Sequence, residues 1–250
     1  MKIVSWNCNG ALRKKLAEID SLDADVYIVQ ECENPADSTA AYQDWAGDCL
    51  WIGKSKSKGL GVFPKKGNKV VAANWQGTYE VPGSSRECNA ARWTSSDLQF
   101  FLPFTLNDKW SILGVWTKGS DNQVFGYIGQ LWKYLQIHRD QLSGPRTLVI
   151  GDFNSNAIWD KSDRWWNHSD VVRELADLGI HSVYHAAHDE RQGEETTPTF
   201  FLYRDRERPY HIDYAFASRD ILEKCQLGIG QADTWLRASD HMPVQVNVRT

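Results

Sequence analysis

The order of apolar and polar positions divides the first 31 residues into a strand, a helix and a second strand. Residues 2–6 are mostly apolar and run into the polar turn 7–10, which is the pattern of a strand end. Leucine and isoleucine side chains then recur at helical spacing over residues 12–22, between charged side chains that would face water. The continuous apolar run 26–29 is typical of a buried strand and ends in a glutamine and a glutamate.

The middle of the chain has a different pattern. Between Leu50 and Val115, short β-like runs alternate with turns, which predicts antiparallel strands. The runs cover residues 59–63, 70–71, 99–102 and 110–116.

A later segment repeats the plan of the first 31 residues. Apolar positions from Ile128 to His138 predict a helix, which stops at the Ser-Gly-Pro sequence 143–145. The apolar run 147–150 then predicts a buried strand that ends in the polar sequence Gly-Asp-Phe-Asn at 151–154.

The C-terminal part predicts one more helix and two strands. We expect Ser169 to cap a helix that runs to Leu178 and closes at Gly179. Residues 211–216 predict a strand, and the alternating valines of 244–248 predict the last one.

These elements predict an α/β fold. Two mixed β-sheets packed face to face, with helices outside, would bury the apolar strands in a single domain spanning residues 1–250. Such packing would also bring the polar strand ends together on one rim.

Composition fits an ordinary globular protein. Apolar residues make up 42% of the 250 positions and charged residues 24%, which excludes a disordered chain, a collagen and a coiled coil. No apolar run approaches the roughly 18 residues that cross a bilayer, and no signal segment is visible. The five cysteines are odd in number and form no CxxC pair, which indicates neither a disulfide framework nor a zinc ribbon. We therefore expect a soluble, reduced, cytoplasmic protein.

Charge limits how the chain could bind nucleic acid. Lys and Arg number 28 against 32 Asp and Glu, so the formal net charge is −4. Binding through bulk charge needs a basic protein, so a nucleic-acid contact here must be a local patch. The candidates are the lysine-serine stretch 54–58, the pair Lys65-Lys66 and the arginines of 204–208, all of which could equally be solvated loops.

Several acidic and amide side chains stand at the predicted strand ends. Four of them offer the carboxylate oxygens that a hard divalent cation prefers, and these are Glu31, Asp152, Asp213 and Asp240. Asn7 and Asn154 are neutral donors suited to phosphoryl oxygens. His241 can offer a proton or a positive charge near neutral pH, and a carboxylate such as Asp213 would orient its ring. A metal, an oriented water and oxyanion donors are what phosphodiester hydrolysis requires.

The order and spelling of five motifs resemble the endonuclease/exonuclease/phosphatase superfamily. The motifs are SWNCNG at 5–10, VQE at 29–31, GDFN at 151–154, HIDY at 211–214 and SDHMP at 239–243. They run in the family's order along nearly the whole chain and are most similar to exonuclease III and apurinic-endonuclease-like members. The resemblance implies a deoxyribonuclease I-like four-layer sandwich and Mg²⁺- or Mn²⁺-dependent phosphoester hydrolysis.

The resemblance also implies roles for individual residues. Glu31 resembles the principal metal ligand, Asn7 lies nearby on the metal or phosphate, and Asp240 resembles a further carboxylate on the metal side. Asp152 resembles the group that orients or deprotonates the attacking water, and Asn154 matches a phosphate contact.

The same resemblance pairs Asp213 with His241 on the scissile phosphate, and this chain departs from the family elsewhere. Trp116 stands where the family offers a His or Tyr. Cys32-Glu33 replaces Thr-Lys, which would place an acid where a base meets DNA, and Tyr210 replaces a Trp. These departures bear on the substrate and leave the hydrolytic set intact.

Substrate contacts are expected from four side chains near the motifs, namely Asn9, Trp116, Trp165 and Trp166. The chain has 12 tryptophans, and a Trp can fill a core, stack on a base or dip into a lipid surface. Trp159 belongs to the same stretch. A separate metal site at His185 and His188 is disfavoured, because the spacing is unconvincing for zinc and no cysteine lies close by in the sequence.

Three functions stay open at this point. The first is a nuclease, with DNA the preferred partner and RNA an alternative. The second is a phosphatase or phosphodiesterase of a small nucleotide, inositol phosphate or lipid headgroup, which the negative net charge favours. The third is a non-catalytic binding protein, which we rank last because the acidic set is complete.

Overall fold

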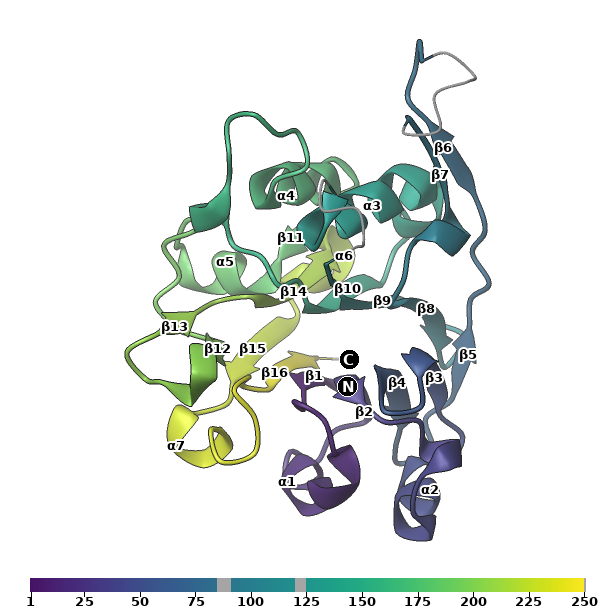
Figure 1. Cartoon of the computed structure of the whole chain (residues 1–250), viewed down its shortest axis with the longest axis vertical. Helices are drawn as coiled ribbons and strands as arrows, with labels where there is room; N and C mark the ends of the chain where they lie inside the picture. The colour runs from purple at the N-terminus through teal and green to yellow at the C-terminus, as the bar shows by residue number, and fades with distance from the viewer. Residues whose placement is uncertain (85–90, 120–124, 250) are drawn as a thin grey trace.

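The computed structural model describes residues 1–84, 91–119 and 125–249, and in them two six-stranded mixed sheets face each other (Figure 1). The first sheet has the order β15-β16-β1-β2-β4-β3. Its strands are β1 (Lys2–Asn7), β2 (Val26–Cys32), β3 (Leu50–Ser55), β4 (Lys58–Pro64), β15 (Cys225–Ile229) and β16 (Val244–Val248). Strands β1 and β2 are parallel, and their neighbours are antiparallel.

The second sheet has the order β11-β14-β10-β9-β8-β5. Its strands are β5 (Val70–Ala72), β8 (Phe101–Leu106), β9 (Trp110–Trp116), β10 (Thr147–Asp152), β11 (Ile180–Ser182) and β14 (Asp213–Ser218). Here β9 and β10 form the parallel pair, so each sheet has one parallel pair at its centre. Two small hairpins complete the strands, β6 (Thr78–Glu80) with β7 (Arg92–Thr94), and β12 (Phe200–Phe201) with β13 (Pro209–Tyr210).

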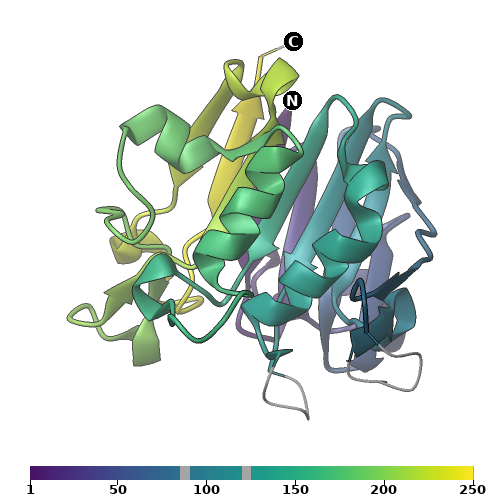
Figure 2. The ribbon, with the colours of Figure 1, turned by 90° about the horizontal axis from the view of Figure 1, so that it is seen from above.

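Helices pack against both sheets, and four of them lie on the outer faces. The helices are α1 (Leu16–Asp20), α2 (Ala40–Ala46), α3 (Ile128–Leu142), α4 (His168–Asp177), α5 (Val183–His188), α6 (Arg219–Leu222) and α7 (Ala232–Trp235). Figure 1 shows α1 and α2 outside the first sheet, and α3 and α4 outside the second. In Figure 2 the teal α3 and green α4 lie in front of the strands of the second sheet. The expected four-layer sandwich is confirmed.

Three hydrophobic clusters fill the spaces between these layers. The cluster between the sheets includes Ile28, Leu106 and Ile150, all fully buried. A second cluster joins the second sheet to α3 and α4, and a third joins the first sheet to α1 and α2. Apolar side chains therefore cover both faces of each sheet, which is why the strands appear in the sequence as continuous apolar runs.

The two ends of the described chain lie side by side (Figure 2). The Met1 amino group donates to the Val248 carbonyl at 3.0 Å, and the Val248 N–H donates to the Met1 carbonyl at 2.8 Å. None of the helices in the described ranges is long and apolar enough to cross a membrane. Cys8, Cys32, Cys49 and Cys225 are free thiols, and Cys88 lies outside the described residues.

Three details of the expected elements were wrong. The single helix over 12–22 is broken into a 3-10 turn at Leu12–Lys14 and α1, because Lys15 between them is not helical. Asn167, not Ser169, caps α4 and forms a capping box with Asp170.

Strand β8 also differs from the expected run at 99–102. It begins at Phe101 because Ser95–Asp97 form a 3-10 turn just before it, and it continues to Leu106. The side chains that face the inter-sheet core from β8 are therefore Leu102, Phe104 and Leu106.

Candidate active site

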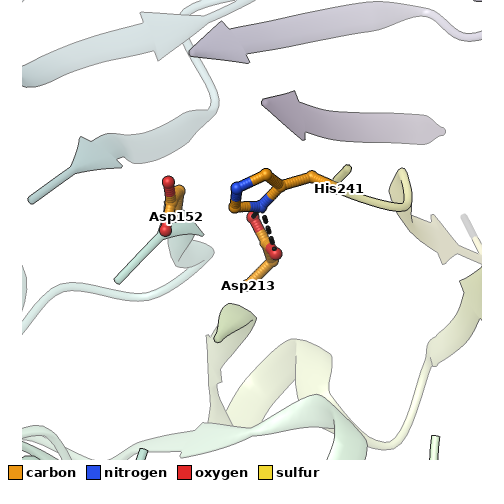
Figure 3. Close-up of side chains that lie close together, drawn as sticks. All are labelled: Asp152, Asp213 and His241. Atoms are coloured by element: carbon orange, nitrogen blue, oxygen red, sulfur yellow. Dashed lines mark hydrogen bonds and ion pairs between the residues drawn. The ribbon is translucent and has the colours of Figure 1, made fainter. Parts of the chain in front are cut away.

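Four polar side chains from different elements meet at one end of the paired sheets. Asn7 ends β1, Asp152 ends β10, and Asp213 begins β14. The antiparallel register places Asp152 directly opposite Asp213, and His241 stands just before β16 (Figure 3). The structure thus brings these four sequence-predicted residues together.

Asp152 is fully buried and accepts three hydrogen bonds. Asn7 Nδ2 donates to Asp152 Oδ2 across the gap between the sheets, at 2.9 Å. Asn154 contributes its backbone N–H at 2.8 Å to Oδ1 and its side-chain Nδ2 at 2.8 Å to Oδ2. Burial is the main reason that the pKa of Asp152 rises to about 7, and the nearby charge of His241 opposes that rise. A carboxyl with this pKa can accept a proton from water near neutral pH.

The turn after β10 holds Asn154 in its place. Its backbone has a φ of 44°, a left-handed conformation that asparagine tolerates better than most residues. Asn154 Nδ2 also donates to the Thr117 carbonyl at 3.0 Å, and the Thr117 N–H donates to the Asp152 carbonyl at 3.0 Å. Gly151, with a φ of 153°, lets β10 approach β9 closely, since a Cβ there would lie 1.9 Å from the Val115 carbonyl oxygen.

Asp213 and His241 form a buried ion pair. The His241 Nδ1 donates to the Asp213 carboxylate, with distances of 2.9 Å to Oδ2 and 3.2 Å to Oδ1. Burial lowers the pKa of His241, but the carboxylates of Asp213 and Asp152 outweigh it and raise the pKa to about 9. The imidazole is therefore positively charged at neutral pH, and its ring lies between the two carboxylates in Figure 3.

Hydrogen bonds between hydroxyl side chains and the backbone hold this pair in position. Most of these hydroxyl groups were not predicted from the sequence. Ser239 Oγ accepts from the His241 N–H at 3.0 Å and donates to the Asn7 carbonyl at 2.7 Å. Thr199 Oγ1 accepts from the Asp213 N–H at 3.0 Å. Ser239 had a signal, since it stands inside the SDH motif, whereas Thr199 had none that a single sequence could show.

Asp152, Asp213 and His241 also form a group of three possible metal ligands, with one ligand atom from each within 4.8 Å of the others. The charge on His241 argues for another use of this group. A protonated imidazole cannot coordinate a cation, and its Nδ1 is already bonded to Asp213. The remaining ring N–H is a donor suited to an oxyanion such as a phosphoryl oxygen.

The expected metal ligands Glu31 and Asp240 stand outside that group. Glu31 follows Gln30, whose carbonyl accepts from the Cys8 N–H at 3.0 Å, so it lies beside the end of β1. Its backbone has a φ of 61° at a β-bulge, and its carboxylate, 20% exposed, pairs with the ammonium of Lys58. Asp240 is half-buried next to His241. Glu31 and Asp240 therefore offer two partly exposed carboxylates beside the cluster, which are the oxygen donors that fit a hard divalent ion, and such an ion would take the place of the Lys58 ammonium on Glu31.

The expected substrate contacts divide into buried and exposed side chains. Trp116 is 2% exposed and Trp166 is 8% exposed, so both indoles fill the core. This corrects their expected role, because a buried ring offers no surface for a substrate. Trp165 is 59% exposed, and Asn9 is exposed beside Asn7, to which its N–H donates at 3.0 Å. The Trp165 and Asn9 side chains are therefore accessible from solvent.

Glu33 is a second correction. Its carboxylate is 6% exposed and accepts from the Leu12 N–H at 2.8 Å and the Arg13 N–H at 3.2 Å. The Arg13 guanidinium adds a salt bridge at 2.8 Å. This acid therefore stabilises the turn before α1 and does not face a substrate, so it gives no argument against nucleic acid.

The histidines of α5 form no metal centre among the described residues. His185 Nε2 bonds to Glu195 Oε1 at 3.1 Å, and Asn156 Nδ2 bonds to Glu195 Oε2 at 2.9 Å. Although burial opposes it, the bonds from His185 and Asn156 lower the pKa of Glu195 to about 2. The Glu195 carboxylate is thus ionised, and its hydrogen bond from Asn156 holds the loop that follows Asn154.

The comparisons with known proteins identify the family and the fold. Residues 4–241 match the model of the Endonuclease/Exonuclease/phosphatase family. The chain is similar over its whole length to three solved structures, each also covered completely. These are the 3′ phosphatase NExo from Neisseria bound to a product DNA hairpin (TM-score 0.69, 18% identity), the 3′-5′ exonuclease NExo from Neisseria meningitidis (0.68, 20%) and an AP endonuclease from Archaeoglobus fulgidus (0.67, 15%). No curated protein matches the chain.

Proposed function

Because the chain belongs to the endonuclease/exonuclease/phosphatase family, we propose that it is a divalent-metal-dependent phosphodiester hydrolase, and specifically a nuclease acting on DNA. The observation that carries this proposal is the arrangement of a charged Asp213–His241 pair beside the buried, proton-accepting Asp152. The named activities of the Neisseria and Archaeoglobus proteins support the same chemistry.

Each side chain has a role that follows from its contacts. Asn7 and Asn154 hold the Asp152 carboxylate in one orientation, and Asp152 accepts a proton from the water that attacks phosphorus. His241, kept charged by Asp213, donates from its free ring nitrogen to a non-bridging phosphoryl oxygen.

Glu31 and Asp240, with Asn7 nearby, would hold Mg²⁺ or Mn²⁺. When bound, the ion supplies positive charge that neutralises the phosphoryl oxygens. Hydrolysis breaks one P–O ester bond, forms one P–O bond to water and leaves a phosphate monoester and a hydroxyl.

The test is hydrolysis by the purified protein with Mg²⁺ or Mn²⁺, on single- and double-stranded DNA, abasic duplex, RNA and bis-p-nitrophenyl phosphate. EDTA should abolish the activity. Asp152→Asn should lower kcat by about 10²- to 10⁴-fold, the usual contribution of a general base, without loss of folding. The control is Asp44→Asn, on the exposed surface of α2, which should leave kcat unchanged. Near-wild-type kcat in Asp152→Asn would sink the role given to this residue.

A second candidate keeps the site and changes the substrate. The Neisseria relative is named a 3′ phosphatase, and the same donors could bind a terminal phosphate monoester. Release of inorganic phosphate from a 3′-phosphorylated oligonucleotide, with no shortening of the strand, would favour this activity over the nuclease. Cleavage of the small ester alone would instead favour a hydrolase of small phosphoesters.

A further inference from the structure

A cleft of about 490 Å³ opens beside the candidate active site, between the β3–β4 hairpin and the ends of the strands of the second sheet. Lys54 and Lys58 contribute from the hairpin, and Lys118 contributes from the residues just after β9. We call these three side chains and the space between them the lysine cleft. All three lysines are exposed.

Residues on both walls of the lysine cleft contact, or stand next in the chain to, residues that adjoin the catalytic cluster. On one wall, Lys58 forms an ion pair with Glu31, the candidate metal ligand. On the other, Lys118 follows Thr117, whose carbonyl accepts from Asn154 Nδ2 at 3.0 Å. A strand whose scissile phosphate sat on the cluster would therefore continue into this cleft.

The charge of the cleft suits an anion. Asp97 is the one acid among its lining residues, and its Oδ2 accepts from the Thr94 N–H at 2.7 Å and from Thr94 Oγ1 at 2.9 Å. The Asp97 carboxylate is therefore already hydrogen-bonded within the turn that it belongs to. Within the described part of the chain, neither Lys54 nor Lys118 forms an ion pair, and Lys118 Nζ lies 4.4 Å from the centre of the Trp116 ring. The Lys118 ammonium group therefore lies at the surface, above the buried ring of Trp116.

The uncharged side chains that line the cleft are better suited to contacts with phosphate oxygens than to contacts with bases. Ser55 and Ser57 add hydroxyls at the hairpin tip, and Gln99 adds an amide. The aromatic side chain in the lining, Phe100, is buried and presents no face on which a base could stack. A site of this composition is suited to contacts with the phosphates of a nucleic acid, and such contacts do not depend on its sequence.

We propose that the lysine cleft binds the phosphodiester backbone of the substrate strand next to the scissile phosphate, and so selects polynucleotides over small phosphoesters. This rests on the proposed function, because the same strand would occupy the catalytic cluster. It also explains how a chain of net charge −4 can use a polyanion as its substrate, since the positive charge is needed only locally.

The test compares two substrates in one double variant, Lys54→Gln with Lys118→Gln. We expect kcat/KM on a single-stranded oligonucleotide to fall about tenfold or more, mainly through KM, by a similar factor for different sequences. Hydrolysis of bis-p-nitrophenyl phosphate should change by less than about twofold. The slope of log kcat/KM against log salt concentration should become shallower by about 1.4, which is about 0.7 for each of two lost phosphate contacts on a single strand.

Two controls separate charge from packing. Lys109→Gln removes an exposed lysine in the turn between β8 and β9, at the opposite end of β9 from Lys118, and it should leave both substrates unaffected. The double variant with arginine at positions 54 and 118 should restore the oligonucleotide rate and the salt slope, because arginine also binds phosphate.

Several results would overturn the proposal. Equal losses on both substrates would mean that the lysines act on the catalytic cluster, and no loss on the oligonucleotide relative to Lys109→Gln would mean that the cleft is unused. Lysine-dependent binding to anionic phospholipid vesicles, with oligonucleotide turnover intact, would assign the cleft to a membrane.

A measurement without turnover keeps the cleft testable if the hydrolase proposal itself fails. Fluorescence anisotropy of a labelled oligonucleotide in EDTA should show a Kd at least tenfold weaker for the double glutamine variant. An unchanged Kd would reject the lysine cleft whatever the enzyme hydrolyses.

Discussion

The charge on His241 comes from one neighbour more than from any other. Burial alone would leave the imidazole neutral, since a low-dielectric surrounding disfavours the charged form. The Asp213 carboxylate at 2.9 Å reverses this effect, and Asp152 adds to it. Two buried side chains that would each be costly alone thus stabilise one another, and the resulting cation keeps one ring N–H that is not bonded to Asp213.

These pKa values predict a bell-shaped dependence of activity on pH. Asp152 must be ionised to accept a proton, so kcat/KM should rise as pH passes about 7, and it should fall above about 9 as His241 loses its charge. Asp213→Asn removes the anion that favours the imidazolium, so the upper limb should move from about 9 toward the ordinary value of 6.5.

The pH profile of bis-p-nitrophenyl phosphate hydrolysis in wild type and variant checks this, with Asp177→Asn on the exposed face of α4 as the control. An upper limb that stays at pH 9 in Asp213→Asn would show that another group carries it.

At the scale of the elements, helical periods predicted α3 and α4 close to their observed bounds, and apolar runs did the same for several strands. Strands buried on both faces appear as short apolar runs, and β1, β2, β9 and β10 lie close to where those runs predicted them. The segment 12–22 has a helical period, but the carboxylate of Glu33, which is distant in sequence, takes the Leu12 and Arg13 N–H groups and fixes a tight turn instead. A periodicity cannot show a capping group that lies 20 residues away.

The residues of the candidate active site were also predictable where a local pattern marked them, and not where only the fold brings them together. Polar residues at the ends of apolar runs predicted Asn7 and Asp152, because a buried strand carries its terminal side chain to a defined edge. Asp213 was predicted because a carboxylate inside an apolar run is costly unless it is paired. The burial of Trp116 could not be predicted, since a tryptophan after an apolar run fits a rim and a core equally well. Thr199 was missed because its hydroxyl acts only on backbone brought near it by the fold.

The close approach of β9 and β10 predicts a sensitive position. Gly151→Ala would place a Cβ 1.9 Å from the Val115 carbonyl oxygen, on backbone that cannot swing aside, at a φ of 153°. We expect a loss of about 2–5 kcal/mol in the free energy of unfolding, from overpacking and backbone strain together. Because Asp152 follows directly, kcat should fall as well.

Urea denaturation and turnover of the small ester measure the two effects of Gly151→Ala. Gly228→Ala in the edge strand β15 is the matched control, since its Cβ would meet only Gln245 at 3.7 Å, an ordinary contact. A loss of stability in Gly151→Ala no larger than that of Gly228→Ala would contradict the steric argument.

At the scale of the whole molecule, the candidate active site exists only when the two sheets are packed. Asn7 and His241 belong to the first sheet or its border, whereas Asp152 and Asp213 belong to the second. The bonds from Asn7 to Asp152 and from His241 to Asp213 both cross between the sheets. Neither sheet contains the catalytic set alone, so the core between them supports both stability and function. We expect residues 1–250 to unfold as one cooperative unit.

Leu106→Ala tests this coupling at a distance from the chemistry. Leu106 is fully buried between the sheets and pairs with Trp110, at the end of β9 remote from Trp116 and the catalytic cluster. Its truncation should cost about 2–5 kcal/mol in the free energy of unfolding, whereas Val71→Ala, at an exposed valine, should cost less than about 0.5 kcal/mol. In urea, tryptophan fluorescence, circular dichroism and esterase activity should be lost in one transition that shifts equally for all three probes. At low urea, kcat per folded molecule should be unchanged. Two separate transitions, or activity lost before fluorescence, would show that the sheets are not one cooperative unit.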